Sequence, residues 1–258
     1  MEDFVREIIV PMALRRRWAK FCEIGASLGQ STDRLLALGD VSITVIDPCL
    51  DLDLAAKYSA EPRVAVCRGL SLDVLPTLNT SFDCILVDGD HNWFTVLEEL
   101  RVIRERKSLR PGGMIFLDDV EWPYGRRDMY YQPDVIPAPF RHPHSRRGIV
   151  RGKAELSDNS GLNAGLCNAL LEGGPRNGVL TAVEDFLGEH CGKYRFFRIQ
   201  RDTGLGAILC KGSFLGDFWF LKVALRSAAY NLFTWPKRLT RSRFPSAYRI
   251  AKSILGRA

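Results

Sequence analysis

The chain has 258 residues, of which 46% are hydrophobic and 26% charged, so it can bury a core without disulfides or structural metals. No apolar run reaches the about 18 residues that a transmembrane helix needs, and the acidic start at Met1–Phe4 lacks a signal-peptide pattern. The seven cysteines show no CxxC or zinc-type spacing. This usage favours a reducing compartment, so we expect a cytoplasmic protein.

The net charge of +6 comes from the C-terminal segment. Residues 213–258 hold nine Lys/Arg and one acid, so the first 212 residues keep 27 basic and 29 acidic residues. A basic, aromatic, amphipathic tail can bind an anionic membrane peripherally, which would place it at the inner membrane surface. Docking on its own core or a homo-oligomer contact is the simpler interpretation. No nucleic-acid partner is expected, because no nucleic-acid-binding fold motif is present.

Apolar strand-like segments alternate with amphipathic helical segments through the first 117 residues. Helical spacing is expected first over residues 3–20, where Phe4, Ile8, Ile9 and Met12 share one face and Pro11 kinks or ends the helix. Further helices are predicted from Ser31 or Thr32 (as cap) to Leu38, over 52–58 and over 93–106; strands are predicted over 21–25, 42–46, 63–67, 82–87 and 114–117, with a turn at 109–113. This alternation predicts an α/β fold with a doubly wound, Rossmann-like parallel sheet.

The second half departs from this alternation and then resumes it. Residues 120–178 are rich in Pro, Gly, Arg and aromatic residues without a clear period, which predicts a long, ordered lid. A helix near 179–190 and two closing strands, 195–200 and 207–211, would complete a seven-stranded sheet. We therefore expect one domain over 1–212, with a lid insertion at about 120–178, and a tail over 213–258.

The turn after the first strand limits which cofactor the sheet can bind. Open α/β sheets bind ligands at the carboxyl ends of their strands. A dinucleotide fingerprint beginning at Gly25 would need glycines at positions occupied by Ser27 and Gln30. A P-loop would need Gly-Lys at residues 30–31 and is also excluded.

Glu23, Gly25 and Gly29 match the E-x-G-x-x-x-G turn of class I S-adenosylmethionine (SAM) methyltransferases. Residues 21–119 resemble this family, above all its small-molecule O-methyltransferase branch, through Asp88-Gly-Asp-His91 and Leu109-Arg-Pro-Gly-Gly113. The resemblance implies that SAM is held at the ends of the first four strands. The implied SAM-binding residues are Glu23, Gly25, Ser27, Gly29, Asp47, Gly69, Ser71 and Asp88.

Four carboxylates and an imidazole are expected near one edge of the sheet. Asp88, Asp90 and His91 follow the fourth strand, and Asp118 and Asp119 follow the fifth. Such a cluster requires a counter-charge, and a divalent cation with oxygen ligands is the simplest one. Resemblance to metal-dependent catechol-type and macrolide-sugar O-methyltransferases implies that Asp88, Asp118 and Asp119 bind Mg²⁺ and that His91 is the base. Asp90 is expected to cap the helix that starts near Trp93. Alternatively, Asp119 pairs with a lid arginine and no metal is used.

The lid offers further candidate residues. Trp122–Tyr131 directly follows Asp119 and should lie over the active site, where aromatic faces suit a sugar or an apolar ring. Arg126 and Arg127 hold an acidic substrate group or neutralise the acidic cluster. The turn at 173–178 binds an anion at a helix N-terminus or simply closes the lid, and His142 and His144 are interpreted as surface residues.

The function expected from these features is SAM-dependent, magnesium-assisted methylation of a hydroxyl on a small molecule, with a sugar or a glycosylated natural product as the leading acceptor. One alternative is a metal-independent N- or O-methyltransferase in which His91 acts alone. Another is a SAM-fold binding or scaffold subunit that docks a partner or a membrane through its tail.

Overall fold

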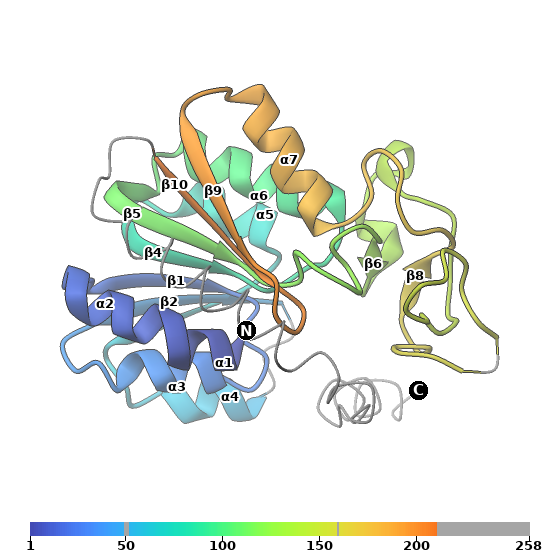
Figure 1. The fold of residues 1–258 in the computed structure, drawn as a ribbon. Helices are drawn as coiled ribbons and strands as arrows, with labels where there is room; N and C mark the ends of the chain where they lie inside the picture. Colours follow the sequence, from blue (N-terminus) through green and yellow to red (C-terminus); the bar gives the residue numbers. More distant parts are fainter. Residues whose placement is uncertain (49–51, 159, 211–258) are drawn as a thin grey trace.

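The computed structural model describes residues 1–48, 52–158 and 160–210 (Figure 1). The predictions about the tail at 213–258, including its membrane and oligomer contacts, lie outside the described residues.

The main sheet has seven strands in the order β3-β2-β1-β4-β5-β10-β9. β1 to β5 pair in parallel, whereas β10 runs antiparallel to both β5 and β9. The predicted doubly wound sheet, its parallel strands and its closing hairpin are therefore confirmed. The strands are β1 (Lys20–Ile24), β2 (Ser42–Asp47), β3 (Val64–Arg68), β4 (Phe82–Val87), β5 (Leu109–Leu117), β9 (Tyr194–Ile199) and β10 (Leu205–Cys210).

Helices cover both faces of this sheet, because the strands of its centre are apolar on both sides. α1 to α4 cover one face and α5 to α7 the other (Figure 1). Two hydrophobic cores result: one includes Ile9 and Phe116, and the other includes Val96 and Phe186. The helices are α1 (Glu2–Phe4), α2 (Val10–Arg16), α3 (Gln30–Leu36), α4 (Leu52–Tyr58), α5 (Ser71–Val74), α6 (Trp93–Glu105) and α7 (Val179–Glu189), with a π-helical stretch at Val5–Ile9 and 3₁₀ turns at Leu75–Thr77, Pro133–Val135 and Ala138–Phe140.

Two local predictions need correction. The first helical segment ends at Arg16 rather than residue 20 and contains the π-helical stretch just before Pro11. Proline has no N–H to donate into the preceding turn, which favours a local change of helical geometry there. Residues 109–113, predicted as a turn, are the first half of β5, and a register shift between Phe82 and Cys84 accommodates them.

The lid contains a small antiparallel sheet that the sequence did not predict. Its strands are β6 (Met129–Tyr130), β7 (His144–Ser145) and β8 (Cys167–Ala169), in the order β6-β8-β7. These strands are two or three residues long, so they carry too few residues for an alternating pattern to be visible. Figure 1 shows the lid beside the edge of the main sheet at which α6 and α7 begin.

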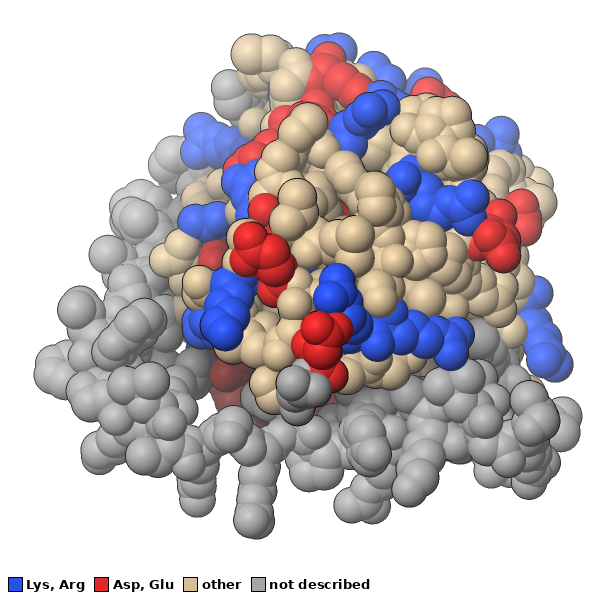
Figure 2. All heavy atoms as spheres, turned by 90° about the vertical axis from the view of Figure 1, so that its right-hand side faces the viewer, with Lys and Arg blue, Asp and Glu red and all other residues tan. Residues whose placement is uncertain are grey.

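The lid face carries charges of both signs. Figure 2 shows Lys and Arg interspersed with Asp and Glu among broad uncharged areas. A single-sign field that would attract a polyanion is therefore not present on the part of this face that is drawn in colour. Among the described residues, no helix combines the length and the apolarity that crossing a membrane requires.

Candidate active site

The glycine turn after β1 lies directly against the loop after β4. Gly25 has φ +81°, and a Cβ at this position would lie 2.4 Å from the carbonyl oxygen of Asp88 and 2.5 Å from the nitrogen of Gly89. Only glycine fits such an approach and such a dihedral angle. The predicted position of Gly25 in a tight turn is therefore explained by contact with the loop that carries Asp88 and His91.

Asp47, at the end of β2, holds the same turn in place. Its Oδ2 accepts hydrogen bonds from the backbone nitrogens of Ala26 at 2.9 Å and Ser27 at 3.0 Å. Ser27 has φ +51° and Gly29 has φ +77°, so with Gly25 the turn contains three residues with positive φ. The carboxylate predicted to bind a ribose thus has a structural contact with the turn on one of its two oxygens.

Glu23 is buried beneath the turn, where Thr32 Oγ1 donates a hydrogen bond to its Oε2 at 2.5 Å. Burial raises the pKa of Glu23 to about 7, although the Thr32 hydroxyl opposes this shift. The prediction that Ser31 or Thr32 caps the next helix is wrong. α3 begins after Gly29, and no side chain caps it, because the Thr32 hydroxyl is used by Glu23.

Ser71, at the start of α5, is joined to α6. Its hydroxyl donates a hydrogen bond to Glu99 Oε1 at 2.5 Å, while Glu99 Oε2 is buried without a hydrogen-bond partner among the described residues. Burial raises the pKa of Glu99 to about 8. Gly69 lies just before Ser71, and a Cβ there would come within 2.9 Å of Val74. The end of β3 therefore combines a tight turn with the Ser71 hydroxyl, whose hydrogen is donated to Glu99.

Asp88, His91 and Asp119 converge at the ends of β4 and β5. One ligand-type atom from each lies within 4.8 Å of the others, and His91 Nδ1 is 3.2 Å from Asp119 Oδ2. Asp119 has φ +57°, a left-handed conformation with which the chain leaves β5. The predicted convergence of the two acidic segments is confirmed for these three residues.

Asp118 belongs to a neighbouring set of contacts. Its Oδ1 accepts hydrogen bonds from Thr203 Oγ1 at 2.7 Å and from the backbone nitrogen of Asp119 at 2.9 Å. Its Oδ2 contacts the terminal ammonium of Met1, which lies 3.8 Å from Asp88 Oδ2. An ammonium group is therefore accommodated between Asp88 and Asp118.

The carboxylates of this cluster differ in their electrostatic surroundings. Burial and the nearby Asp118 raise the pKa of Asp88 well above its usual range, although the Met1 ammonium opposes them. Burial and Asp118 also raise the pKa of Asp119. Burial acts the same way on Asp118, but the Met1 ammonium and the Thr203 hydroxyl outweigh it and lower its pKa. Charge remains uncompensated mainly at Asp88 and Asp119.

The lid covers the imidazole with aromatic rings, as predicted for Trp122–Tyr131. Tyr124 stacks on His91 with 5.5 Å between ring centroids and 13° between planes, and the exposed Tyr131 lies 6.0 Å away. The backbone nitrogen of Met129 donates to the carbonyl of His91 at 3.0 Å. The lid thus fixes His91 through both its ring and its backbone.

Asp90 is not the cap of α6, contrary to the prediction. Asn92 is the N-cap residue, and its Oδ1 accepts from the backbone nitrogen of Thr95 at 2.9 Å. Asp90 instead accepts the Thr95 hydroxyl at 2.9 Å. Both residues are good helix caps, so residue type alone could not separate positions two apart.

The two lid arginines have structural partners. Arg127 is fully buried and donates to the carbonyls of Ala154 and Ala169, and Arg126 pairs with Glu184 through two contacts of 2.6 Å. Neither of these contacts reaches the acidic cluster.

Asp128 explains the turn at 173–178. Its Oδ1 accepts from the backbone nitrogens of Trp93 at 2.7 Å and Gly178 at 2.6 Å, and its Oδ2 accepts from the Tyr130 hydroxyl at 2.8 Å. The Asp128 carboxylate therefore accepts hydrogen bonds at the N-termini of both α6 and α7. The anion at the N-terminus of α7 is this side chain of the protein itself. Asn177 closes the turn, because its Oδ1 accepts a hydrogen bond from the backbone nitrogen of Asp128.

Sequence reasoning did not single out Tyr131, Glu99 or Thr203 as residues near the site. Tyr131 lay within the predicted aromatic lid. Glu99 is a carboxylate on the apolar face of the predicted helix 93–106, a pattern that indicates a buried acid. Thr203, in the hairpin between β9 and β10, carried no signal, because only the pairing of β10 with β5 brings it to Asp118.

The fold is similar to that of a solved methyltransferase structure. The structure of the Podospora anserina methyltransferase PaMTH1 bound to SAH superposes with a TM-score of 0.52 and 17% identity over 79% of this chain and 76% of that chain. The O-methyltransferase TomG from Streptomyces achromogenes, involved in tomaymycin synthesis and solved with SAM, gives 0.49 and 19% over 80% and 78%. A putative caffeoyl-CoA O-methyltransferase from Staphylococcus aureus gives 0.48 and 16% over 80% and 83%.

The sequence comparison agrees with the fold. Residues 22–120 match a family model described as a methyltransferase domain. No curated protein sequence matches the chain. The chain is therefore similar to methyltransferases in fold and, over residues 22–120, in sequence.

Proposed function

We propose that the protein is a SAM-dependent O-methyltransferase that transfers a methyl group to a hydroxyl of a small molecule, with a sugar or a glycosylated natural product as the acceptor. The observation that carries the proposal is the imidazole–carboxylate pair His91–Asp119 beside the glycine turn. It is supported by the matched family over residues 22–120. The printed names of TomG and of the caffeoyl-CoA-type protein agree with oxygen as the acceptor atom.

The groups proposed to bind SAM lie at the ends of β1 to β4. Glu23, Gly25, Ser27 and Gly29 form the turn, and Asp47 offers a carboxylate to the ribose hydroxyls. Gly69 and Ser71, at the end of β3, are proposed to contact the adenine, and the apolar side chains of Leu28 and Leu70 are exposed. The Met1 ammonium held between Asp88 and Asp118 is the kind of group that the methionine part of SAM also carries. The proposed SAM-binding residues are Glu23, Gly25, Ser27, Gly29, Asp47, Gly69, Ser71 and Asp88.

His91 is proposed as the general base. His91 Nδ1 lies 3.2 Å from Asp119 Oδ2, and the proposed tautomer carries its proton on Nδ1, so that Nε2 is the proton acceptor. Asp119 would then orient the ring and stabilise its protonated form, while Tyr124 holds it by stacking. Bound SAM supplies an electrophilic methyl group on a sulfonium. The role of this chain is to align the acceptor oxygen with that group and to remove its proton.

A divalent metal fits part of the same cluster. Asp88, His91 and Asp119 offer two oxygens and a nitrogen within 4.8 Å, and the raised pKa values of both carboxyls reflect a shortage of positive charge. Mg²⁺ held by Asp88 and Asp119, with Asp118 as the further oxygen ligand, would supply Lewis acid chemistry at the acceptor hydroxyl. If His91 were itself a ligand, an imidazole-tolerant metal would be favoured over Mg²⁺, and His91 would not act as the base.

Calorimetric titration with SAM, followed by transfer of labelled methyl groups to a panel of glycosides, phenols and lipids, tests the proposal. We expect SAM to bind and a hydroxyl acceptor to be methylated. Absence of SAM binding would contradict the proposal. SAM binding without turnover on any acceptor would favour the scaffold alternative, and methylation of amines alone would favour N-transfer. Activity that survives both EDTA and Asp118→Ala would remove the metal from the mechanism.

A further inference from the structure

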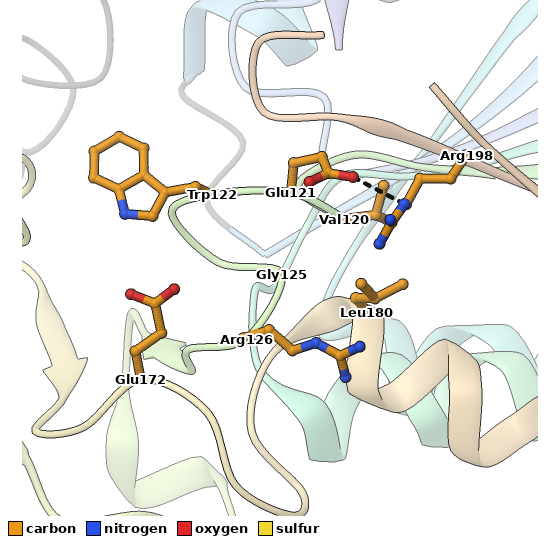
Figure 3. Close-up of a pocket in the computed structure, with 8 residues that line it drawn as sticks. All are labelled: Val120, Glu121, Trp122, Gly125, Arg126, Glu172, Leu180 and Arg198. Carbon is orange, nitrogen blue, oxygen red and sulfur yellow. Dashed lines mark ion pairs between the residues drawn. The ribbon is translucent and has the colours of Figure 1, made fainter. Parts of the chain in front are cut away.

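A cavity of about 220 Å³ begins at Val120, the residue that follows Asp119 (Figure 3). Its lining comes from four places: the segment that leaves β5, the lid at Glu172, the first turn of α7, and β9. β9 runs parallel to β5, because each of them is antiparallel to β10. Arg198, near the carboxyl end of β9, therefore lies at the same edge of the sheet as Asp119. The lining residues are Val120, Glu121, Trp122, Gly125, Arg126, Glu172, Leu180 and Arg198.

The cavity is within reach of the reacting groups. Trp122 is three residues after Asp119, so their Cα atoms are at most about 11 Å apart even if the chain is fully extended. Val120 lies between them and is fully buried. A molecule with one ring in the cavity can therefore extend a neighbouring hydroxyl toward His91 without leaving this edge of the sheet.

The lining carries hydrogen-bonding groups from three side chains. Trp122 Nε1 is buried and has no hydrogen-bond acceptor within the described part of the chain. Arg198 uses its Nε toward Glu121 at 2.9 Å, and Figure 3 shows its terminal nitrogens directed toward Leu180 and Arg126. Across the cavity, the partly exposed Glu172 lies 3.8 Å from Arg127. Donors and an acceptor therefore face the same space.

The charges around this space are balanced. Arg198 is paired with Glu121, and Arg126 is paired with Glu184 through two contacts of 2.6 Å. The Trp122 ring is held by Arg151, whose guanidinium lies 4.5 Å from the ring centroid. A fully charged ligand would disturb these pairs. A neutral group with several hydroxyls both donates and accepts, and so it can satisfy Glu172, Trp122 Nε1 and Arg198 together.

We propose that this cavity holds a neutral, hydroxyl-rich ring of the methyl acceptor, and that Trp122, Glu172 and Arg198 determine acceptor specificity through it. The volume is below the about 300–1,000 Å³ typical of pockets for drug-sized ligands, which fits a single six-membered ring. This inference rests on the proposed function, because it assigns the ring to the molecule that is methylated.

The test measures binding of methyl α-D-glucopyranoside, methyl α-D-mannopyranoside and methyl α-L-rhamnopyranoside by saturation-transfer NMR and calorimetry, in the presence of SAM. Cyclohexanol serves as a ring without the additional hydroxyls. We expect at least one glycoside to bind more tightly than cyclohexanol, and Trp122→Phe and Glu172→Gln each to weaken it about 10-fold, as for loss of one buried hydrogen bond. Glu189→Gln removes a carboxylate from a remote ion pair with Arg101 and should leave binding unchanged.

Three outcomes would overturn the inference: none of the glycosides binds, the two cavity variants bind as tightly as the parent protein, or the anionic glycoside methyl α-D-glucopyranosiduronate binds more tightly than the neutral glycosides. The last result would assign the cavity to an anionic group. SAM affinity and methyl transfer are measured on the same samples. If SAM does not bind, the proposed function fails; if SAM binds and methyl transfer occurs while the cavity variants have no effect, only the cavity assignment fails.

Discussion

Two buried acidic sites lie at the same end of the molecule, and they are satisfied to very different degrees. At Asp128, both carboxylate oxygens accept hydrogen bonds, three in all, of 2.6–2.8 Å. At the cluster proposed to be catalytic, the contacts among the described residues include His91 Nδ1 at 3.2 Å from Asp119 Oδ2 and the Met1 ammonium at 3.8 Å from Asp88 Oδ2. The fold satisfies the hydrogen-bonding capacity of Asp128, whereas it leaves that of Asp88 and Asp119 only partly satisfied.

This difference distinguishes a carboxylate with a structural role from carboxylates that can still bind a ligand. A carboxylate that accepts hydrogen bonds from two helix N-termini is stabilised by them and has no capacity for a ligand. Carboxylates that repel each other beside an imidazole are stabilised when a cation or a proton binds to them, and a substrate or a metal can supply either. Substitutions at both sites test this contrast, and their expected effects range from a large loss of stability to almost none.

Asp128→Ala should cause the largest loss of stability. The substitution leaves the buried N–H groups of Trp93 and Gly178 and the Tyr130 hydroxyl without their acceptor. We expect the free energy of unfolding to fall by about 3–5 kcal/mol in urea denaturation. Asp134→Ala is the control, because this residue pairs with Arg141 while fully exposed. A loss similar to that of the control would show that Asp128 does not organise the two helices.

His91→Ala should have the largest effect on activity. Turnover is expected to fall by about 100-fold or more, while SAM affinity stays nearly unchanged, because the imidazole is proposed to remove a proton rather than to bind SAM. Steady-state kinetics and calorimetry measure the two quantities. His142→Ala removes a lid imidazole whose Nε2 lies 2.8 Å from the Arg176 carbonyl oxygen, and it should keep turnover. Loss of SAM binding in His91→Ala would instead assign the residue a structural role.

Glu99→Gln should change the pH dependence of stability. The pKa of Glu99 is raised to about 8 by burial, so in the parent protein stability is lost as pH rises from about 4.5, where the unfolded chain ionises, to about 8. Glutamine does not ionise. The free-energy difference between variant and parent should therefore move in favour of the variant by about 2 kcal/mol between pH 6.5 and pH 8.5. Parallel curves for the two proteins would contradict the raised pKa.

Arg126→Gln should have the smallest effect. The Arg126–Glu184 pair is well formed but 40% and 48% exposed, and pairs of this kind stabilise proteins by less than about 1 kcal/mol. Urea denaturation at two salt concentrations should show a small loss that shrinks further in high salt. A loss above about 2 kcal/mol would contradict this prediction, because the exposed pair would then contribute to the free energy of unfolding almost as much as the buried Asp128.

The sequence was informative wherever a pattern repeats within one element. Alternation of strand and helix predicted the parallel, doubly wound sheet, and the glycines at 25 and 29 located the turn. It was less informative where competing partners decide the outcome. Thr32 is a good helix cap, yet it bonds Glu23, and Asn92 rather than Asp90 caps α6. In both cases the winning partner comes from the three-dimensional arrangement, which residue type does not encode.

The lid shows the same limit more strongly. Its aromatic content predicted that it covers the site, and Tyr124 does stack on His91. Its strands were too short to recognise, and the partners of Arg127 are backbone carbonyls more than 25 residues away. Backbone acceptors are present at every position, so no sequence pattern marks the ones that a buried arginine will use.

The contact between Gly25 and Gly89 makes two loops move as one. No side chain separates the turn proposed to hold the methyl donor from the loop that carries Asp88 and His91, since a Cβ on Gly25 would lie 2.5 Å from Gly89. A displacement of the first loop by even part of an ångström must therefore be transmitted to the second. Occupancy of the donor site and the placement of the proton acceptor are in this way mechanically linked, without any hinge or moving domain.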